Sequence, residues 1–262
     1  MVQRSALLNV MTAAVQKTAR GLVRDFGETE NLQVSKKGPG DFVSAADKKA
    51  EQTLIAELTK ARPNYGFLLE ESGEIEGTDT SNRWIIDPLD GTTNFLHGIP
   101  HFSISIALER DGELAAGVIY EPITDQMFTA EKGQGAHLND NRIRVSARRS
   151  LEESLFATGI PFARNEDHDR FLAQLKSAMM VSAGIRRFGS AALDLAYVAA
   201  GRFEGFWEIG LKSWDMAAGI VLVREAGGFV TDLAGGGDML ETGDIIAAND
   251  FLHEPLRKIL TV

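Results

Sequence analysis

The sequence contains no cysteine. This absence excludes a disulfide scaffold and a catalytic thiol, and it fits the reducing cytoplasm, where we expect the protein to act. An excess of positive charge is also absent, because 27 Lys and Arg residues stand against 37 Asp and Glu, for a net charge of −10. A nucleic-acid-binding protein needs a basic surface to neutralise phosphates, so direct binding of nucleic acid is not expected.

Signals for membrane insertion and for a divided chain are missing as well. The apolar residues at the N-terminus are interrupted by Arg4, Asn9 and Gln16, so we expect neither a signal peptide nor a membrane span there. There is no low-complexity linker and no internal repeat. The 262 residues, 44% of them hydrophobic, suffice for one large α/β domain or two fused sub-domains.

The first half of the chain carries the patterns of helices and of an antiparallel sheet. Apolar residues recur at steps of three and four over residues 5–26, which predicts an amphipathic helix. Ser44, followed three residues later by Asp47, predicts a capping box that opens a second helix, ending near Ala61. Alternating and apolar segments predict strands near residues 102–108, 114–120, 127–130 and 143–145. Residues 1–149 are therefore expected to form helices packed on an antiparallel sheet.

From residue 150 onward the pattern changes to an alternation of strands and helices. Strands are expected near residues 155–159, 203–208, 229–231 and 245–248, and helices near residues 167–180, 190–200 and 214–226. Such alternation is typical of an α/β layer, so we expect residues 150–262 to form a second, α/β half. Two halves that meet without a linker commonly share a cleft that holds a site.

Two carboxylates stand three residues apart in the stretch 84–95, Trp-Ile-Ile-Asp-Pro-Leu-Asp-Gly-Thr-Thr-Asn-Phe. The apolar run predicts a buried strand that ends at Asp87, because Pro88 cannot extend a sheet ladder and Gly91 permits a tight bend. Asp87 and Asp90 would then repel each other by about 4 kcal/mol at 4 Å, so the pair needs a cation or a shared proton. Oxygen ligands without Cys or His favour a magnesium-like ion. The alternative is a turn held by Asx hydrogen bonds.

Three more acids lie at the boundaries of predicted elements. Glu70 follows the apolar residues 67–69 and is expected at the end of a strand, whereas Asp47 and Asp215 stand near the starts of helices. A carboxylate at a helix N-terminus is stabilised by the helix dipole. Asp47 and Asp215 therefore fit either a capping role or a place in a site, and the sequence leaves both interpretations open.

Four motifs in order resemble those of the inositol monophosphatase family of metal-dependent, lithium-sensitive phosphatases. Residues 87–95 resemble the first signature of that family, and residues 214–228 (Trp-Asp-Met-Ala-Ala-Gly-Ile to Glu-Ala-Gly-Gly) resemble the second. Residues 41–47 and 70–72 match two upstream elements, although relatives often carry Gly where Leu69 stands. The resemblance implies an α/β fold, the alternating αβαβα sandwich of the sugar phosphatases, and a homodimer.

The resemblance also implies a set of metal ligands. Glu70, Asp87 and the backbone carbonyl of Leu89 would hold a first Mg²⁺, and Asp87, Asp90 and Asp215 would hold a second. A weaker third ion would depend on Glu70 and water, and Li⁺ would inhibit.

The same resemblance implies roles in catalysis and substrate binding. Thr92, paired with Asp47, would orient the attacking water, so Glu70, Thr92 and Asp47 would be the catalytic residues. The backbone N–H groups of Gly91 and Thr92 would bind the phosphate. The alcohol part of the substrate would contact Asp90, Gly189, Ser190, Ala191 and Glu208.

The expected activity is Mg²⁺-dependent hydrolysis of inositol-1-phosphate or a similar small polyol phosphate. Fructose-1,6-bisphosphatase, histidinol-phosphatase and adenosine 3′,5′-bisphosphate phosphatase activities stay open, because relatives with these activities share the metal site. A protein-binding role in transcription antitermination or ribosome biogenesis is the alternative from another class, since bacterial extragenic suppressor proteins of this type associate with the transcription machinery. The complete set of acids favours an enzyme, and a binding role is compatible with it.

Overall fold

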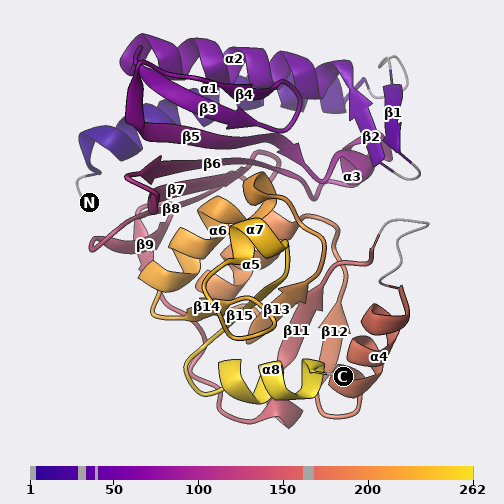
Figure 1. Ribbon diagram of the computed structural model, residues 1–262. Coiled ribbons are helices and arrows are strands. Elements are labelled where there is room, and N and C mark those ends of the chain that lie inside the picture. The colour runs from indigo at the N-terminus through magenta and orange to yellow at the C-terminus, as the bar shows by residue number, and fades with distance from the viewer. Residues whose placement is uncertain (1–3, 29–33, 39–40, 162–167, 262) are drawn as a thin grey trace.

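Two β-sheets and three layers of helices alternate in the computed structural model (Figure 1), which describes residues 4–28, 34–38, 41–161 and 168–261. Helices α1 (Ala6–Phe26) and α2 (Ala45–Ala61) cover one face of the larger sheet. Helices α5 (Ala191–Ala199) and α6 (Ser213–Glu225) lie between the two sheets. Helices α4 (His168–Met179) and α8 (His253–Leu260) cover the outer face of the smaller sheet. The expected layered αβαβα class is confirmed.

The larger sheet has the strand order β10-β9-β8-β7-β6-β5-β3-β4. Its strands are β3 (Tyr65–Leu69), β4 (Gly73–Ile75), β5 (Asp79–Asp90), β6 (Ser103–Arg110), β7 (Glu113–Glu121), β8 (Gln126–Glu131), β9 (Gly135–Leu138) and β10 (Asn141–Ile143). The antiparallel order expected from β6 onward is confirmed. The sheet is not wholly antiparallel, however, because β3 runs parallel to β5.

The two faces of this sheet belong to different cores, as the alternation of side chains along β5 shows. Trp84 and Ile86 are buried against α1 and α2, whereas Ile85 is buried against α5 and α6. Neighbouring side chains of a strand point to opposite faces, so a strand buried on both sides reads as a continuous apolar run. This explains why residues 84–86 carry no polar position.

The smaller sheet is mixed and has the order β12-β11-β13-β15-β14. Its strands are β11 (Leu155–Thr158), β12 (Gly184–Arg186), β13 (Gly205–Glu208), β14 (Phe229–Thr231) and β15 (Ile245–Ala248). β11 pairs in parallel with β12 and β13, and β15 pairs antiparallel with β13 and β14. The alternating strands and helices expected here are present. The division of the chain at residues 149 and 150 stays a prediction.

Several short elements escaped the sequence analysis. They are the hairpin β1 (Val34–Gly38) and β2 (Asp41–Ser44), helix α3 (Thr92–Leu96), the three-residue helix η2 (Leu151–Glu153), strands β4, β9 and β12, helix α7 (Met239–Thr242) and helix α8. Most span three to five residues, too few to show a period.

Among the helices of the described ranges, none is long and apolar enough to cross a lipid bilayer.

Helix α6 lies directly against the larger sheet and against α5, and one glycine permits each of these close approaches. A Cβ added to Gly117 of β7 would lie 2.6 Å from the carbonyl oxygen of Ala218 in α6. A Cβ added to Gly219 would lie 2.4 Å from Cδ1 of Leu195 in α5. Both distances are shorter than a van der Waals contact, so a side chain at either position would push α6 away.

We expect Gly117→Ala to lower the free energy of unfolding by about 1–3 kcal/mol, the usual cost of overpacking, because the opposing atoms are backbone. Gly21→Ala is the matched control, since no atom lies within 4 Å of a Cβ added at that position of α1. It should be neutral or stabilise by up to about 1 kcal/mol. Urea unfolding measures both, and equal effects would contradict this account of α6.

Candidate active site

A β-bulge at the end of β5 places the two motif carboxylates. Asp87 pairs with Ser105 and Asp90 with Ser103, so three steps on β5 face two steps on β6. The expectation that the strand ends at Asp87 was wrong: β5 continues to Asp90, with Pro88 inside the bulge, where the missing N–H does no harm. Gly91 then turns the chain into α3 with φ +94°, as its predicted role requires.

Glu70 lies beside Asp87 because of the parallel pairing of β3 and β5. The pairing aligns Leu69 with Ile86. It continues one residue further, since the backbone N–H of Glu70 donates to the carbonyl oxygen of Ile86 at 3.3 Å. Glu70 and Asp87 are therefore the next residues after this aligned pair, and they lie beside each other at the ends of two adjacent parallel segments. The expectation that Glu70 stands at the end of a strand is confirmed.

Helix N-termini hold the other acids. Oδ2 of Asp215 accepts from the backbone N–H of Lys212 at 2.7 Å where α6 begins, and Oδ2 of Asp47 accepts from the N–H of Ser44 at 2.9 Å where α2 begins. The capping interpretation of both acids is thus confirmed. Asp90 likewise joins the start of α5, where its Oδ2 accepts from Ala192 N at 2.9 Å and from Ser190 Oγ.

One cavity of about 360 Å³ brings these segments together. Of the predicted site residues, it is lined by Glu70, Asp87, Leu89, Asp90, Gly91, Thr92, Gly189, Ser190, Ala191, Glu208 and Asp215. Asp47 lies behind this lining and contacts it through Thr92, whose Oγ1 is 2.9 Å from Asp47 Oδ1. Capping and a place at the cavity are therefore compatible for Asp47 and Asp215.

Sequence reasoning missed several residues of the cavity, Gly159 and Asp194 among them. A Cβ added to Gly159 would lie 1.8 Å from Oε1 of Glu208, so any side chain there would displace the Glu208 carboxylate. Asp194 is buried, and its Oδ1 has no hydrogen-bond partner among the described residues. A lone acid in the otherwise apolar α5 was a signal for Asp194. No local pattern marks Gly159.

Burial and mutual repulsion make the ionised state of these acids unfavourable. Burial, followed by the charges of Glu70, Asp90 and Asp215, raises the pKa of Asp87 well above its ordinary value. Burial raises the pKa of Asp90 to about 6 against the opposing effect of its hydrogen bonds from Ser190 and Ala192. Burial also raises the pKa of Asp215 and that of Glu208, each to about 8. The cavity therefore favours the uptake of protons or cations.

The chemistry of the donors fits a hard divalent cation. The candidate ligands are carboxylate and carbonyl oxygens, which Mg²⁺ prefers, and a divalent charge would offset the repulsion among the carboxylates. Within the described ranges, no three acidic, histidine or cysteine side chains are already gathered as in an assembled metal site. The carbonyl oxygen of Leu89 instead lies 3.0 Å from Thr92 Oγ1. Ion binding would thus draw the ligands together.

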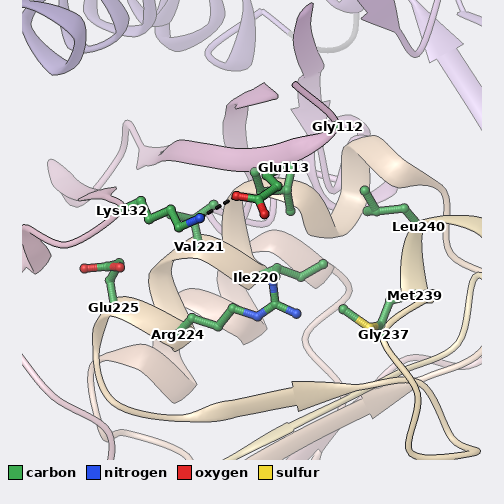
Figure 2. A pocket seen from close by; sticks show the side chains of 11 residues that line it. Gly112, Glu113, Lys132, Ile220, Val221, Arg224, Glu225, Gly237, Met239 and Leu240 are labelled. Carbon is green, nitrogen blue, oxygen red and sulfur yellow. Dashed lines mark hydrogen bonds and ion pairs between the residues drawn. The ribbon is translucent and has the colours of Figure 1, made fainter. Parts of the chain in front are cut away.

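A second cavity, of about 340 Å³, lies beside the C-terminal part of α6 (Figure 2). It is lined by residues that include Glu113, Lys132, Arg224 and Met239, and none of the predicted site residues is among them. Lys132 forms an ion pair with Glu113 at 2.5 Å. The carboxylates that repel one another line the first cavity, so we assign the candidate active site there.

A known protein family matches nearly the whole chain. The model of the inositol monophosphatase family matches residues 3–261. The chain belongs to the inositol monophosphatase family. It is a phosphatase of this family, as the motifs led us to expect.

Individual relatives are similar to this chain over nearly its whole length. The inositol-1-monophosphatase of Rhizobium meliloti (strain 1021) is 59% identical over 257 residues, which cover 98% of this chain and 97% of that protein. The Nus factor SuhB of Escherichia coli (strain K12) is 45% identical over 243 residues, covering 93% and 91%. The crystal structure of the extragenic suppressor protein suhB from Bartonella henselae superposes with a TM-score of 0.96 at 59% identity, covering 98% and 99%.

The raised pKa values predict how stability depends on pH in the absence of divalent ions. Each of these acids keeps its proton to a higher pH when folded than when unfolded, where the pKa is about 4. The resulting stability is complete below that value and is lost as the pH rises through about 6 for Asp90 and about 8 for Asp215 and Glu208.

In EDTA, we therefore expect the urea midpoint to fall as the pH is raised from about 5 to about 9. Mg²⁺ should raise the midpoint most at the alkaline end, and Asp215→Asn should flatten the fall. A midpoint in EDTA that stays constant or rises over this range would contradict the electrostatic description of the cavity.

Proposed function

We propose that this protein is a Mg²⁺-dependent phosphomonoesterase that hydrolyses inositol-1-phosphate or a similar small polyol phosphate. One observation carries the proposal: Glu70, Asp87, Asp90 and Asp215 come from distant segments and line a single cavity beside Thr92. The cavity, of about 360 Å³, lies at the small end of the range of ligand pockets, which suits a compact substrate.

The oxygen donors suggest the ligands of two ions. Glu70, Asp87 and the carbonyl of Leu89 would hold one Mg²⁺, Asp87, Asp90 and Asp215 would hold a second, and Glu70 would contribute to a weaker third. When bound, such ions neutralise phosphate charge and favour ionisation of water and departure of an alkoxide. The family relationship further supports inhibition by Li⁺, a homodimer and a cytoplasmic location as parts of the proposal.

Thr92 and Asp47 would orient the attacking water. Oγ1 of Thr92 lies 2.9 Å from Asp47 Oδ1 and 3.0 Å from the carbonyl oxygen of Leu89. A hydroxyl has one proton to donate and lone pairs with which to accept. When Thr92 donates to Asp47, it accepts from the water, so that an oxygen lone pair of the water points at phosphorus. Asp47 is itself fixed by Ser44.

Different residues of the cavity would bind the phosphate and the alcohol. The N–H groups of Gly91 and Thr92, where the chain turns into α3, would donate to phosphate oxygens. A side chain at position 91 would crowd this turn, because an added Cβ would lie 3.1 Å from the carbonyl oxygen of His101. Glu208, Asp90 and the segment 189–191 would bind the alcohol hydroxyls.

We expect Asp87→Asn and Asp215→Asn each to lower turnover of inositol-1-phosphate by about 100-fold or more at limiting Mg²⁺, because each removes a charge that would hold an ion. Asp232→Asn is the matched control, since Asp232 is buried outside this cavity and accepts from Gly236 N at 2.8 Å. Phosphate release from purified protein measures the effect.

Nearly normal turnover in either active-site variant at limiting Mg²⁺ would refute the proposed mechanism. A substrate panel with fructose-1,6-bisphosphate, histidinol phosphate and adenosine 3′,5′-bisphosphate tests the alcohol. Equal or faster hydrolysis of one of these would replace the polyol assignment and leave the metal chemistry intact.

A second function is supported by the relatives named Nus factor SuhB, at 43–47% identity. We infer that the protein also binds the transcription machinery through a surface that does not need the acids of the cavity. Purified RNA polymerase with antitermination factors should be captured equally by wild type and by Asp87→Asn. Absence of capture by the wild type would exclude this role, and loss in the variant alone would tie binding to the cavity.

A further inference from the structure

Helix α2 carries a second buried acid, one turn after Asp47. Glu51 is 1% exposed, and it lies outside the cavity lining. Its Oε2 accepts from the backbone N–H of Glu71 at 2.9 Å, and its Oε1 accepts from the hydroxyl of Ser72. Both carboxylate oxygens therefore bind the turn that directly follows Glu70.

This turn lies near the edge of the larger sheet. It connects β3 to β4, an edge strand of three exposed residues. Towards β5, the N–H of Glu70 donates to the carbonyl oxygen of Ile86 at 3.3 Å, which is long for a backbone hydrogen bond. Hydrogen bonds to a buried carboxylate are stronger than neutral ones and are shielded from water. Glu51 is therefore a firm anchor for a turn that the sheet holds only at its margin.

Asp47 and Glu51 together make α2 a common support for two parts of the site. Residues four apart lie on the same face of a helix. Asp47 bonds to Thr92, which follows β5, and Glu51 bonds to the turn after β3. One rigid helix thus sets the position of the proposed metal ligand Glu70 relative to the residue proposed to orient water.

We propose that Glu51 is a positioning residue that holds the Glu70 turn in the place where Glu70 binds the first metal ion. The inference rests on the proposed function, because it takes Glu70 as a metal ligand. Outer partners of metal ligands typically contribute 10- to 100-fold in metal affinity. Glu51 is therefore expected to act on the affinity for Mg²⁺ rather than on the chemical step at saturating Mg²⁺.

The test is a titration of the full chain with Mg²⁺ alone, followed by calorimetry. Glu51→Gln, which places an amide N–H group where a donor needs an acceptor, should raise the Mg²⁺ Kd by about 10- to 100-fold. In turnover assays, the Mg²⁺ dependence should shift by a similar factor. The kcat at saturating Mg²⁺ should stay within about threefold of wild type. A general loss of structure would lower kcat as well as the affinity for Mg²⁺, so it would not produce this pattern.

Ser72→Ala tests the same anchor without disturbing the core, because Ser72 is exposed. It removes one of the two hydrogen bonds, so a smaller rise of the Mg²⁺ Kd is expected, about threefold to tenfold. Glu121→Gln is the matched control: Glu121 is 2% exposed and accepts from Gln126 at 3.1 Å and Tyr197 at 3.3 Å. Its Mg²⁺ Kd should equal that of wild type.

The outcomes separate this inference from the proposed function. An unchanged Mg²⁺ Kd in Ser72→Ala and in folded Glu51→Gln would overturn the role of Glu51, while metal-dependent catalysis would stand. If Glu51→Gln does not fold, the Ser72→Ala titration decides. An equal shift in Glu121→Gln would also overturn it, because the effect would then be general. Wild type that binds no Mg²⁺ would refute the proposed function itself.

Discussion

The repulsion among buried carboxylates is the constraint on which the rest of this structure depends. Four acids line one cavity: Glu70 directly follows β3, Asp87 and Asp90 belong to β5, and Asp215 belongs to α6. Burial together with neighbouring charges disfavours the ionised forms of Asp87 and Asp215. Apolar residues in these positions would make the fold more stable, because the free energy of removing a charge from water exceeds what its buried interactions recover. The fold must therefore hold these groups in place, and the layered architecture does so by ending several elements at the same cavity.

Much of this architecture was predictable from the sequence. The period of residues 5–26 and the capping box at Ser44 predicted α1 and α2, because long amphipathic helices repeat their signal many times. The motif acids were predictable too, since each stands at the boundary of a predicted element. Short elements such as β12 and α7 were not, because three or four residues contain no period and are stabilised by tertiary packing.

The support of the site was harder to predict than the site itself. The bulge at Pro88 and Leu89 depends on how β5 pairs with β6, and Gly159 matters only because Glu208 of another strand lies against it. Glu51 looks like an ordinary helical glutamate in the sequence, yet its partners are 20 and 21 residues away. Such roles arise from contacts through space, and one sequence alone does not display them.

The helix N-termini explain how three of the acids are positioned. The stabilisation that a helix terminus gives to a charge is, however, smaller than the repulsion between neighbouring carboxylates. Asp47, Asp90 and Asp215 each accept a backbone N–H at the start of a helix. A helix terminus stabilises a nearby negative charge by about 0.3–1 kcal/mol, and up to about 2 in favourable geometry. Repulsion between two partly buried carboxylates at 4 Å is about 4 kcal/mol. Capping therefore fixes where these carboxylates lie, whereas a bound cation would offset the repulsion among them, so the metal binding proposed above would follow from the way the fold places the acids.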